Sequence, residues 1–352
     1  MKKVCFVVCL LCAGFLFLAG TKEIAAADSG SVAINEENFP DVKFRKLIQE
    51  SMFNRGRDDV LTREEIENAT ALEIRTEDTL DAGDWDITGI EKLENLQSVT
   101  LRLQGVQKGK TITGRAIKGT FQKNAKLTSV VLEADGRKVS KNEIERLFPL
   151  KQIKELCIEN VDIQELSLSQ AAKLKELTVR KCSSLKKIGV SNNKKLEKIT
   201  VENTSVRKLN LKKNVNLREV SVQFGYSCVQ TDLATGKMGK VVFFKWSKRN
   251  CGIQFPKNNN ITKLSYFTTD KALDISSCKK LKEIHISKNT KIKALSRWYQ
   301  KNKKKLTVYA EGFLQKKMNV QRTKKAILLK ATKVKDVGKG FYCEELDKET
   351  ES

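Results

Sequence analysis

Residues 174–222 read LKELTVRKCSSLKKIGVSNNKKLEKITVENTSVRKLNLKKNVNLREVSV. Within them the apolar pattern L-x-x-L-x-L recurs in register, and its third apolar position falls at Val179, Val190, Val201, Leu211 and Val222. The last two apolar residues of each copy are two positions apart, so both point to one face of a short strand. One such strand cannot bury that face alone. Stacked copies do so, and the pattern therefore predicts parallel strands in a repeat solenoid.

Weaker copies extend the repeat in both directions. They fall at residues 96–101, 127–132, 153–158, 281–286 and 292–295. Turns after the strands carry an asparagine or cysteine that we expect to be buried and to satisfy open backbone groups: Asn193, Asn214, Asn289, Cys182 and Cys278. The whole pattern resembles a leucine-rich repeat. The resemblance implies an α/β repeat solenoid with short parallel strands, an irregular convex side and a small helical N-terminal cap.

Residues 34–80 resemble the N-terminal cap of exported leucine-rich repeat proteins of Gram-positive gut anaerobes, a group broadly similar to internalins. The segments that carry this likeness are Ile34-Asn35-Glu36-Glu37-Asn38-Phe39-Pro40 and Val60-Leu61-Thr62-Arg63-Glu64-Glu65-Ile66. The family cap implies two helices joined by a calcium-binding-type loop. Here Asn54, Asp58, Thr62 and Glu65 match ligand positions, but Gly56 and Asp59 replace a ligand and the turn glycine. We expect a vestigial loop without metal, and no cofactor.

Residues 1–27 have the pattern of a secretory signal peptide. Lys2 and Lys3 precede an apolar run of about 16 residues, and three alanines stand before Asp28. An uncleaved anchor and a lipoprotein are the alternatives. We expect a secreted or cell-surface protein with no transmembrane segment in the mature chain. Six cysteines follow this segment, and the 15 possible disulfide pairings remain open.

The composition restricts the kinds of function. The chain has 352 residues, a formal net charge of +25 and one histidine, His285, so multi-histidine metal sites are excluded. Lysine outnumbers arginine 52 to 15. The lysine ammonium is a hydrated point charge, whereas the planar arginine guanidinium makes the paired hydrogen bonds that suit nucleic-acid bases and phosphates. For an exported protein, this composition favours a protein or acidic polysaccharide partner over nucleic acid. A charged surface that only keeps the solenoid soluble is the simpler alternative.

The outward strand positions are the candidate binding surface, and no enzyme motif accompanies them. One row contains Lys187, Ser191, Lys208, Asn210 and Lys212, and the nearby asparagine turns favour its placement on the inner, concave side. An aromatic and basic stretch, residues 223–260, interrupts the repeat and adds Lys245, Trp246, Lys248 and Arg249. Val241 to Trp246 is typical of a strand, one arm of a hairpin.

We divide the chain into the signal, the cap, repeats at 86–222, the insertion at 223–260, repeats at 261–300 and a basic C-terminal cap and tail at 301–352. The resulting expectation is an exported binding or adhesion protein without catalysis. A hydrolase with an unrecognised site on the insertion is the alternative, and a purely structural or inhibitor-like surface protein is another.

Overall fold

The structure is a computed structural model and describes residues 30–52, 59–76, 85–103, 117–136, 138–224, 227–231, 238–243, 251–267, 272–286, 291–293, 306–310 and 332–336. The signal segment and most of the basic C-terminal region lie outside these residues. Among the described residues, no helix is long and apolar enough to cross a bilayer.

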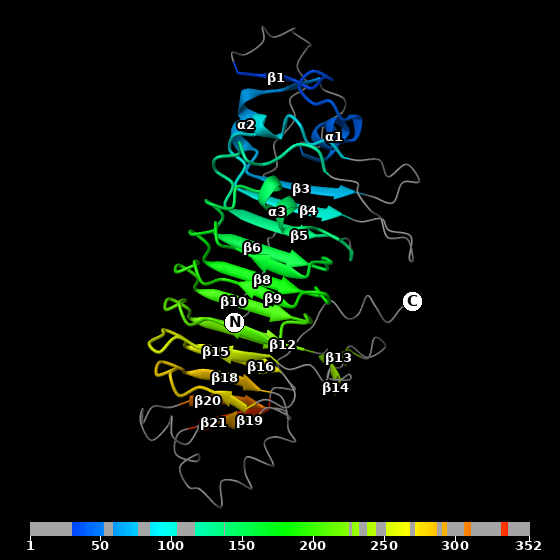
Figure 1. Ribbon diagram of the computed structural model, residues 1–352. Coiled ribbons are helices and arrows are strands. Elements are labelled where there is room, and N and C mark those ends of the chain that lie inside the picture. Colours follow the sequence, from blue (N-terminus) through cyan, green and yellow to red (C-terminus); the bar gives the residue numbers. More distant parts are fainter. Residues whose placement is uncertain are drawn as a thin grey trace, which may run out of the picture.

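One parallel sheet of eleven strands forms the spine of the molecule (Figure 1). Its order from one end is β3 (Ala71–Thr76), β4 (Ser98–Leu103), β5 (Ser129–Glu133), β6 (Glu155–Glu159), β8 (Glu176–Arg180), β10 (Lys198–Glu202), β12 (Glu219–Gln223), β16 (Lys263–Phe267), β18 (Glu283–Ile286), β20 (Leu306–Ala310) and β21 (Thr332–Asp336). Each strand takes its place beside the strand of the preceding coil. The stacked parallel layers predicted from the repeat are confirmed.

The two apolar positions of each repeat point inward, as the two-residue period requires. Leu177 and Val179 of β8 pair in register with Ile199 and Val201 of β10, and all four side chains are fully buried. Burial of one such side chain stabilises the fold by about 1.5–3 kcal/mol. Because every coil adds the same pair, the hydrophobic core runs along the length of the solenoid and is not confined to one central cluster.

A second wall of shorter strands closes the other side of the coils. It contains β7 (Glu165–Ser167), β9 (Lys187–Gly189), β11 (Lys208–Asn210), β15 (Gly252–Gln254), β17 (Ala272–Asp274) and β19 (Lys291–Lys293). These strands are joined only in parallel pairs, β7 with β9, β11 with β15 and β17 with β19. The eleven-stranded sheet is thus continuous, whereas the opposite wall is broken into short ladders.

Buried asparagines hold successive coils together at the corner that follows the short strands. The Asn193 side-chain amide donates to the carbonyls of Leu168 and Ala171 at 2.9 and 2.6 Å. Asn214, one coil later, donates to the carbonyls of Val190 and Asn193, both at 2.9 Å. The predicted role of these two side chains is confirmed. Asn289 lies outside the described residues.

A left-handed residue turns the chain at the other corner, directly after the long strands. Asn160, Lys181 and Asn203 have φ of 49°, 57° and 48°. The Lys181 amide donates to the Glu202 carbonyl at 3.1 Å, so the hydrogen-bond ladder continues one residue past the strand. Left-handed backbone is costly for residues other than glycine, and here the stacked ladder enforces it.

The N-terminal end is closed by β1 (Val32–Ala33), α1 (Val42–Lys46), the π-helix η1 (Leu47–Met52), β2 (Val60–Leu61) and α2 (Arg63–Asn68). The Asp41 carboxylate caps α1 by accepting from the Lys43 and Phe44 amides at 2.7 and 3.1 Å. Two further short helices, η2 (Ile90–Lys92) and α3 (Lys141–Leu147), lie in the connections of the first coils. The end therefore buries the first apolar layer under helices, as expected for a solenoid cap.

The interruption of the repeat contains an antiparallel hairpin, β13 (Ser227–Thr231) with β14 (Met238–Phe243). The predicted strand is confirmed for Val241–Phe243, whereas residues 244–250 lie outside the described part. Around this interruption β12 pairs directly with β16, and β15 already rejoins the short-strand wall. The coil stack therefore continues in register across the hairpin.

Candidate functional site: the strand faces

The predicted lysine row lies on the short-strand wall. Lys187 is on β9, Lys208 and Asn210 are on β11, and Ser191 and Lys212 follow these strands; all five are exposed. Lys187 pairs with Glu165 of the adjacent strand at 2.7 Å. The Asn210 side-chain oxygen accepts from the Lys212 amide at 3.2 Å and shapes the turn. The structure thus brings these residues together on one wall.

The row lies on the short-strand wall, on the opposite side of the coils from the eleven-stranded sheet. Its placement on the inner, concave side stays a prediction. The prediction used Asn193 and Asn214 as markers of the sheet. In the structure they mark the corner that leads into it, because their amides bond to turn carbonyls of the preceding coil. The other predicted group, Lys245, Trp246, Lys248 and Arg249, lies outside the described residues.

The outward face of the eleven-stranded sheet has a central column of small side chains. One residue per strand contributes to it, in the order Thr100, Val131, Cys157, Thr178, Thr200, Ser221 and Ser265. These side chains are half-buried, apart from Cys157, which is 8% exposed. The column is therefore a shallow strip that presents mainly hydroxyl groups.

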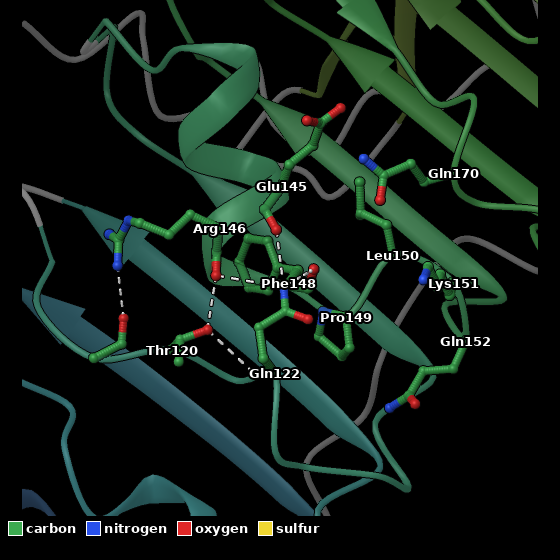
Figure 2. A pocket seen from close by; sticks show the side chains of 11 residues that line it. Thr120, Gln122, Glu145, Arg146, Phe148, Pro149, Leu150, Lys151, Gln152 and Gln170 are labelled. Atoms are coloured by element: carbon green, nitrogen blue, oxygen red, sulfur yellow. Dashed lines mark hydrogen bonds between the residues drawn. The ribbon is translucent and has the colours of Figure 1, made fainter.

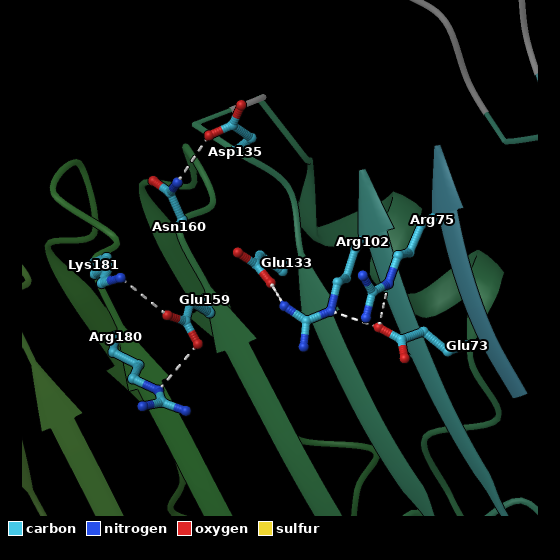
Figure 3. A network of polar contacts seen from close by, with 9 residues as sticks. All are labelled: Glu73, Arg75, Arg102, Glu133, Asp135, Glu159, Asn160, Arg180 and Lys181. Carbon is cyan, nitrogen blue, oxygen red and sulfur yellow. Dashed lines mark hydrogen bonds and ion pairs between the residues drawn. The ribbon is translucent and has the colours of Figure 1, made fainter. Parts of the chain in front are cut away.

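Charged side chains border this strip towards the ends of the strands, and Glu73 of β3 lies in register with Thr100 of the strip. Figure 3 shows Arg102 between two acids of the neighbouring strands. Its guanidinium lies 2.8 Å from the Glu73 carboxylate and 2.6 Å from the Glu133 carboxylate, and Arg75 also contacts Glu73 at 2.8 Å. Burial by itself raises the pKa of Glu73, but the hydrogen bonds and charges of Arg75 and Arg102 outweigh it and lower that pKa below its usual value.

A second group in Figure 3 centres on Glu159 of β6. Glu159 is 8% exposed, and its carboxylate lies 3.1 Å from Arg180 and 3.4 Å from Lys181. The sequence signal is the equivalent position of five of these residues on successive strands: Arg75, Arg102, Glu133, Glu159 and Arg180. On the sequence alone, the lysine row was preferred to this row as the candidate surface. Ordered charges beside a polar strip suit recognition of an extended partner.

The cap residues aligned to a calcium loop serve a different role in the structure. Thr62 caps α2, and the Glu65 carboxylate accepts from the Thr62 backbone amide at 2.8 Å while the Thr62 hydroxyl accepts from the Glu65 amide at 3.2 Å. The sequence Thr62-x-x-Glu65 is typical of this reciprocal capping box. The alignment to a calcium loop assigned both residues to ligand positions instead. Asn54 and Asp58 lie outside the described residues. No cluster of three or more histidine, cysteine or acidic side chains suited to a metal occurs in the described part of the chain.

A recess of about 850 Å³ lies beside α3 (Figure 2). Several of the polar side chains that line it bond to the main chain. Arg146 donates to the carbonyls of Gly119 and Ile117 at 2.8 and 2.6 Å, and Gln122 donates to those of Glu145 and Phe148 at 2.8 and 2.7 Å. These bonds fasten α3 to the preceding coil.

Comparison with known proteins supports the fold. No protein-family model and no curated protein matches the sequence. The structure resembles an internalin (inlF) from Listeria monocytogenes at 20% identity and a TM-score of 0.51, over 78% of this chain and 70% of that chain. An internalin C2 from the same organism aligns at 14% identity with a TM-score of 0.41, over 79% and 96%. The match to inlF, together with the parallel sheet, confirms the leucine-rich repeat solenoid fold.

Proposed function

We propose that the protein is an exported binding or adhesion module that recognises a partner protein or an acidic envelope or host glycan through its outward strand faces. The observation that carries the proposal is the face of the continuous sheet. It combines a strip of small hydroxyl side chains with ordered rows of charge, and solenoids use such extended surfaces to bind. Export and surface location are part of the proposal, and so is the absence of catalysis.

The charge of the chain supports an interaction with a salt dependence. At +25 the protein attracts acidic polymers and acidic protein surfaces over several ångströms, and this attraction weakens as ionic strength rises. A pull-down from cell-envelope and mucin fractions across a salt series identifies the class of partner. A screen of the purified protein against glycoside, ester and peptide substrates tests the absence of catalysis, and turnover in it would favour a hydrolase.

Two variants locate the binding surface. Thr178→Arg with Thr200→Arg fills the strip on the sheet face with long side chains, and we expect it to abolish capture of a partner that lies on this face. Lys187→Glu, Lys208→Glu and Lys212→Glu reverse the charge of the short-strand wall and are expected to abolish capture there. Unchanged capture by both variants, each folded by circular dichroism, would refute recognition through the strand faces.

A further inference from the structure

Polar and charged side chains form a row at the edge where the strands of the continuous sheet begin. In each coil, one residue precedes and one follows the apolar residue that leads into the strand, and we call the resulting set the basic ridge. The preceding residues are Asn95, Lys126, Gln152, Lys173, Lys195, Asn216, Asn260 and Lys280; the following residues are Gln97, Thr128, Lys154, Lys175, Glu197, Arg218, Thr262 and Lys282.

Hydrogen bonds align the positions of this row from coil to coil. The amide of each following residue donates to the carbonyl of its counterpart one coil earlier, as in Lys175 to Lys154 and Arg218 to Glu197, both at 2.7 Å. In the last two coils a side-chain bond also joins two preceding residues, since Lys280 donates to the Asn260 amide oxygen at 2.5 Å. At the strand spacing of about 4.8 Å, the eight coils from Gln97 to Lys282 extend for about 34 Å. The ridge is therefore an ordered array with one pair of positions in each coil.

The charge on the ridge is predominantly positive. Its sixteen positions hold eight cations and one carboxylate, a net charge of +7, and every one of the cations is exposed. The single carboxylate, Glu197, lies 3.8 Å from the Lys175 ammonium. A small recess of about 180 Å³ in the middle of the ridge gathers Lys175, Lys195 and Arg218 with Glu197 and two asparagine amides. Three cations thus converge on one depression.

Carboxylates of the sheet face stand next to the ridge, and cations of that face balance several of them. Glu176 lies 3.4 Å from Lys198, and Glu283 lies 3.2 Å from Lys263. Glu155 and Glu219 also begin strands on this face, and Glu155 accepts from the Ser129 hydroxyl at 3.2 Å. Because the lysines that pair with Glu176 and Glu283 belong to the strands, the ridge retains its own cations for a ligand.

The ridge has the chemistry of a glycan site. A row of cations along successive coils matches a linear polyanion laid along the solenoid axis. Lysine predominates, which suits isolated sulfate or carboxylate groups, and asparagine, glutamine and threonine between the cations offer hydrogen bonds to sugar hydroxyls. None of the sixteen positions is aromatic, so the ridge lacks the stacking platforms that single-stranded nucleic acid uses. We infer that the basic ridge binds an acidic polysaccharide, an inference that rests on the proposed binding function and assigns it a surface and a ligand class.

A heparin oligosaccharide, measured by isothermal titration calorimetry, tests the inference. The ridge variant Lys173→Glu, Lys195→Glu and Arg218→Glu changes three exposed cations that have no ion pair among the described residues. The control Lys138→Glu, Lys186→Glu and Arg207→Glu makes the same change in charge at three exposed cations outside both the ridge and the lysine row, and Lys186 and Arg207 directly precede β9 and β11. We expect the ridge variant to weaken binding at least about tenfold and the control less than about threefold, because only the ridge contacts lie along the chain of the ligand.

Equal weakening by the two variants would overturn the ridge assignment and leave a diffuse attraction to the net charge. A single-stranded oligonucleotide of equal charge that binds the wild type as tightly as heparin, at the same salt, would overturn the glycan class. Failure of the wild type to bind heparin refutes the ridge inference alone, since the sheet-face variant still decides the proposed function. Loss in the control variant alone would keep a glycan partner but move it to the short-strand wall.

Discussion

Replacement of Asn193 by aspartate tests the hydrogen bonds that join the coils. The Asn193 amide group is fully buried and donates to two carbonyl oxygens. Aspartate has almost the same shape, but it replaces the donor by an acceptor that carries a negative charge. The change therefore removes the interaction and leaves the packing nearly intact.

The expected magnitude follows from these contacts. The loss of two hydrogen bonds costs about 1 kcal/mol each, and a buried carboxylate without a compensating charge costs about 3–5 kcal/mol. We expect Asn193→Asp to lower the free energy of unfolding by about 5–7 kcal/mol. Asn193→Ala should lower it by about 2 kcal/mol, because each carbonyl keeps a backbone donor, from Ala171 or Leu174, at 3.0 Å.

Urea denaturation followed by circular dichroism measures both changes, and hydrogen exchange of β8 and β10 locates the loss. Asn192→Asp is the matched control, because Asn192 is the exposed neighbour and the same change there should cost less than about 0.5 kcal/mol. An Asn193→Asp protein within about 1 kcal/mol of this control would refute the role of the amide donor in coil stacking.

The corners and the buried thiols give further predictions. The free energy of unfolding of Lys181→Gly should be about 1 kcal/mol higher than that of Lys181→Ala. Both variants lose the lysine side chain, but only glycine accepts the φ of 57° without strain. Equal urea midpoints for the two variants would contradict the strained turn. Burial raises the pKa of the Cys182 thiol to about 11 and that of Cys278 to about 12. Because the folded pKa is raised, the proton stabilises the folded state below pH 9, and this contribution falls by about 1.4 kcal/mol per pH unit per thiol between pH 9 and the folded pKa. Urea titrations from pH 9 to 11 should show a shallower fall for Cys182→Ala than for the wild type, and identical slopes would contradict it.

The apolar spacing was sufficient to predict the coils and the inward residues. It did not distinguish the two walls, because Leu174-x-x-Leu177-x-Val179 and Leu185-x-x-Ile188-x-Val190 are equivalent as patterns. Their difference arises in the turns. The long strands continue into a left-handed residue such as Lys181 that extends the ladder, and the short strands lead to an asparagine corner. Turn geometry of this kind depends on contacts with the next coil and is absent from a local pattern.

The binding surface was less accessible from the sequence than the core. The members of the lysine row share a wall, as their strand positions predict, and that wall is opposite the continuous sheet. The basic ridge has a visible signal in the sequence, the cations on both sides of Leu174 and Leu281. Its continuity becomes evident only when the backbone bonds between coils align those positions. The capping box of Thr62 and Glu65 is a second case, in which a local sequence pattern is visible but its role becomes evident only from the hydrogen bonds.

Distances between spin labels on the sheet face test the stacked architecture most directly. Labels at Thr100 paired in turn with Thr178, Thr200, Ser221 and Ser265 lie three, four, five and six strands apart. The account predicts distances that grow by about 5 Å per strand, with Ser265 only one step beyond Ser221 although 44 residues separate them. A separation between those last two positions that follows their distance in sequence, or one that shows no regular step at all, would contradict the continuous sheet and the surfaces built on it.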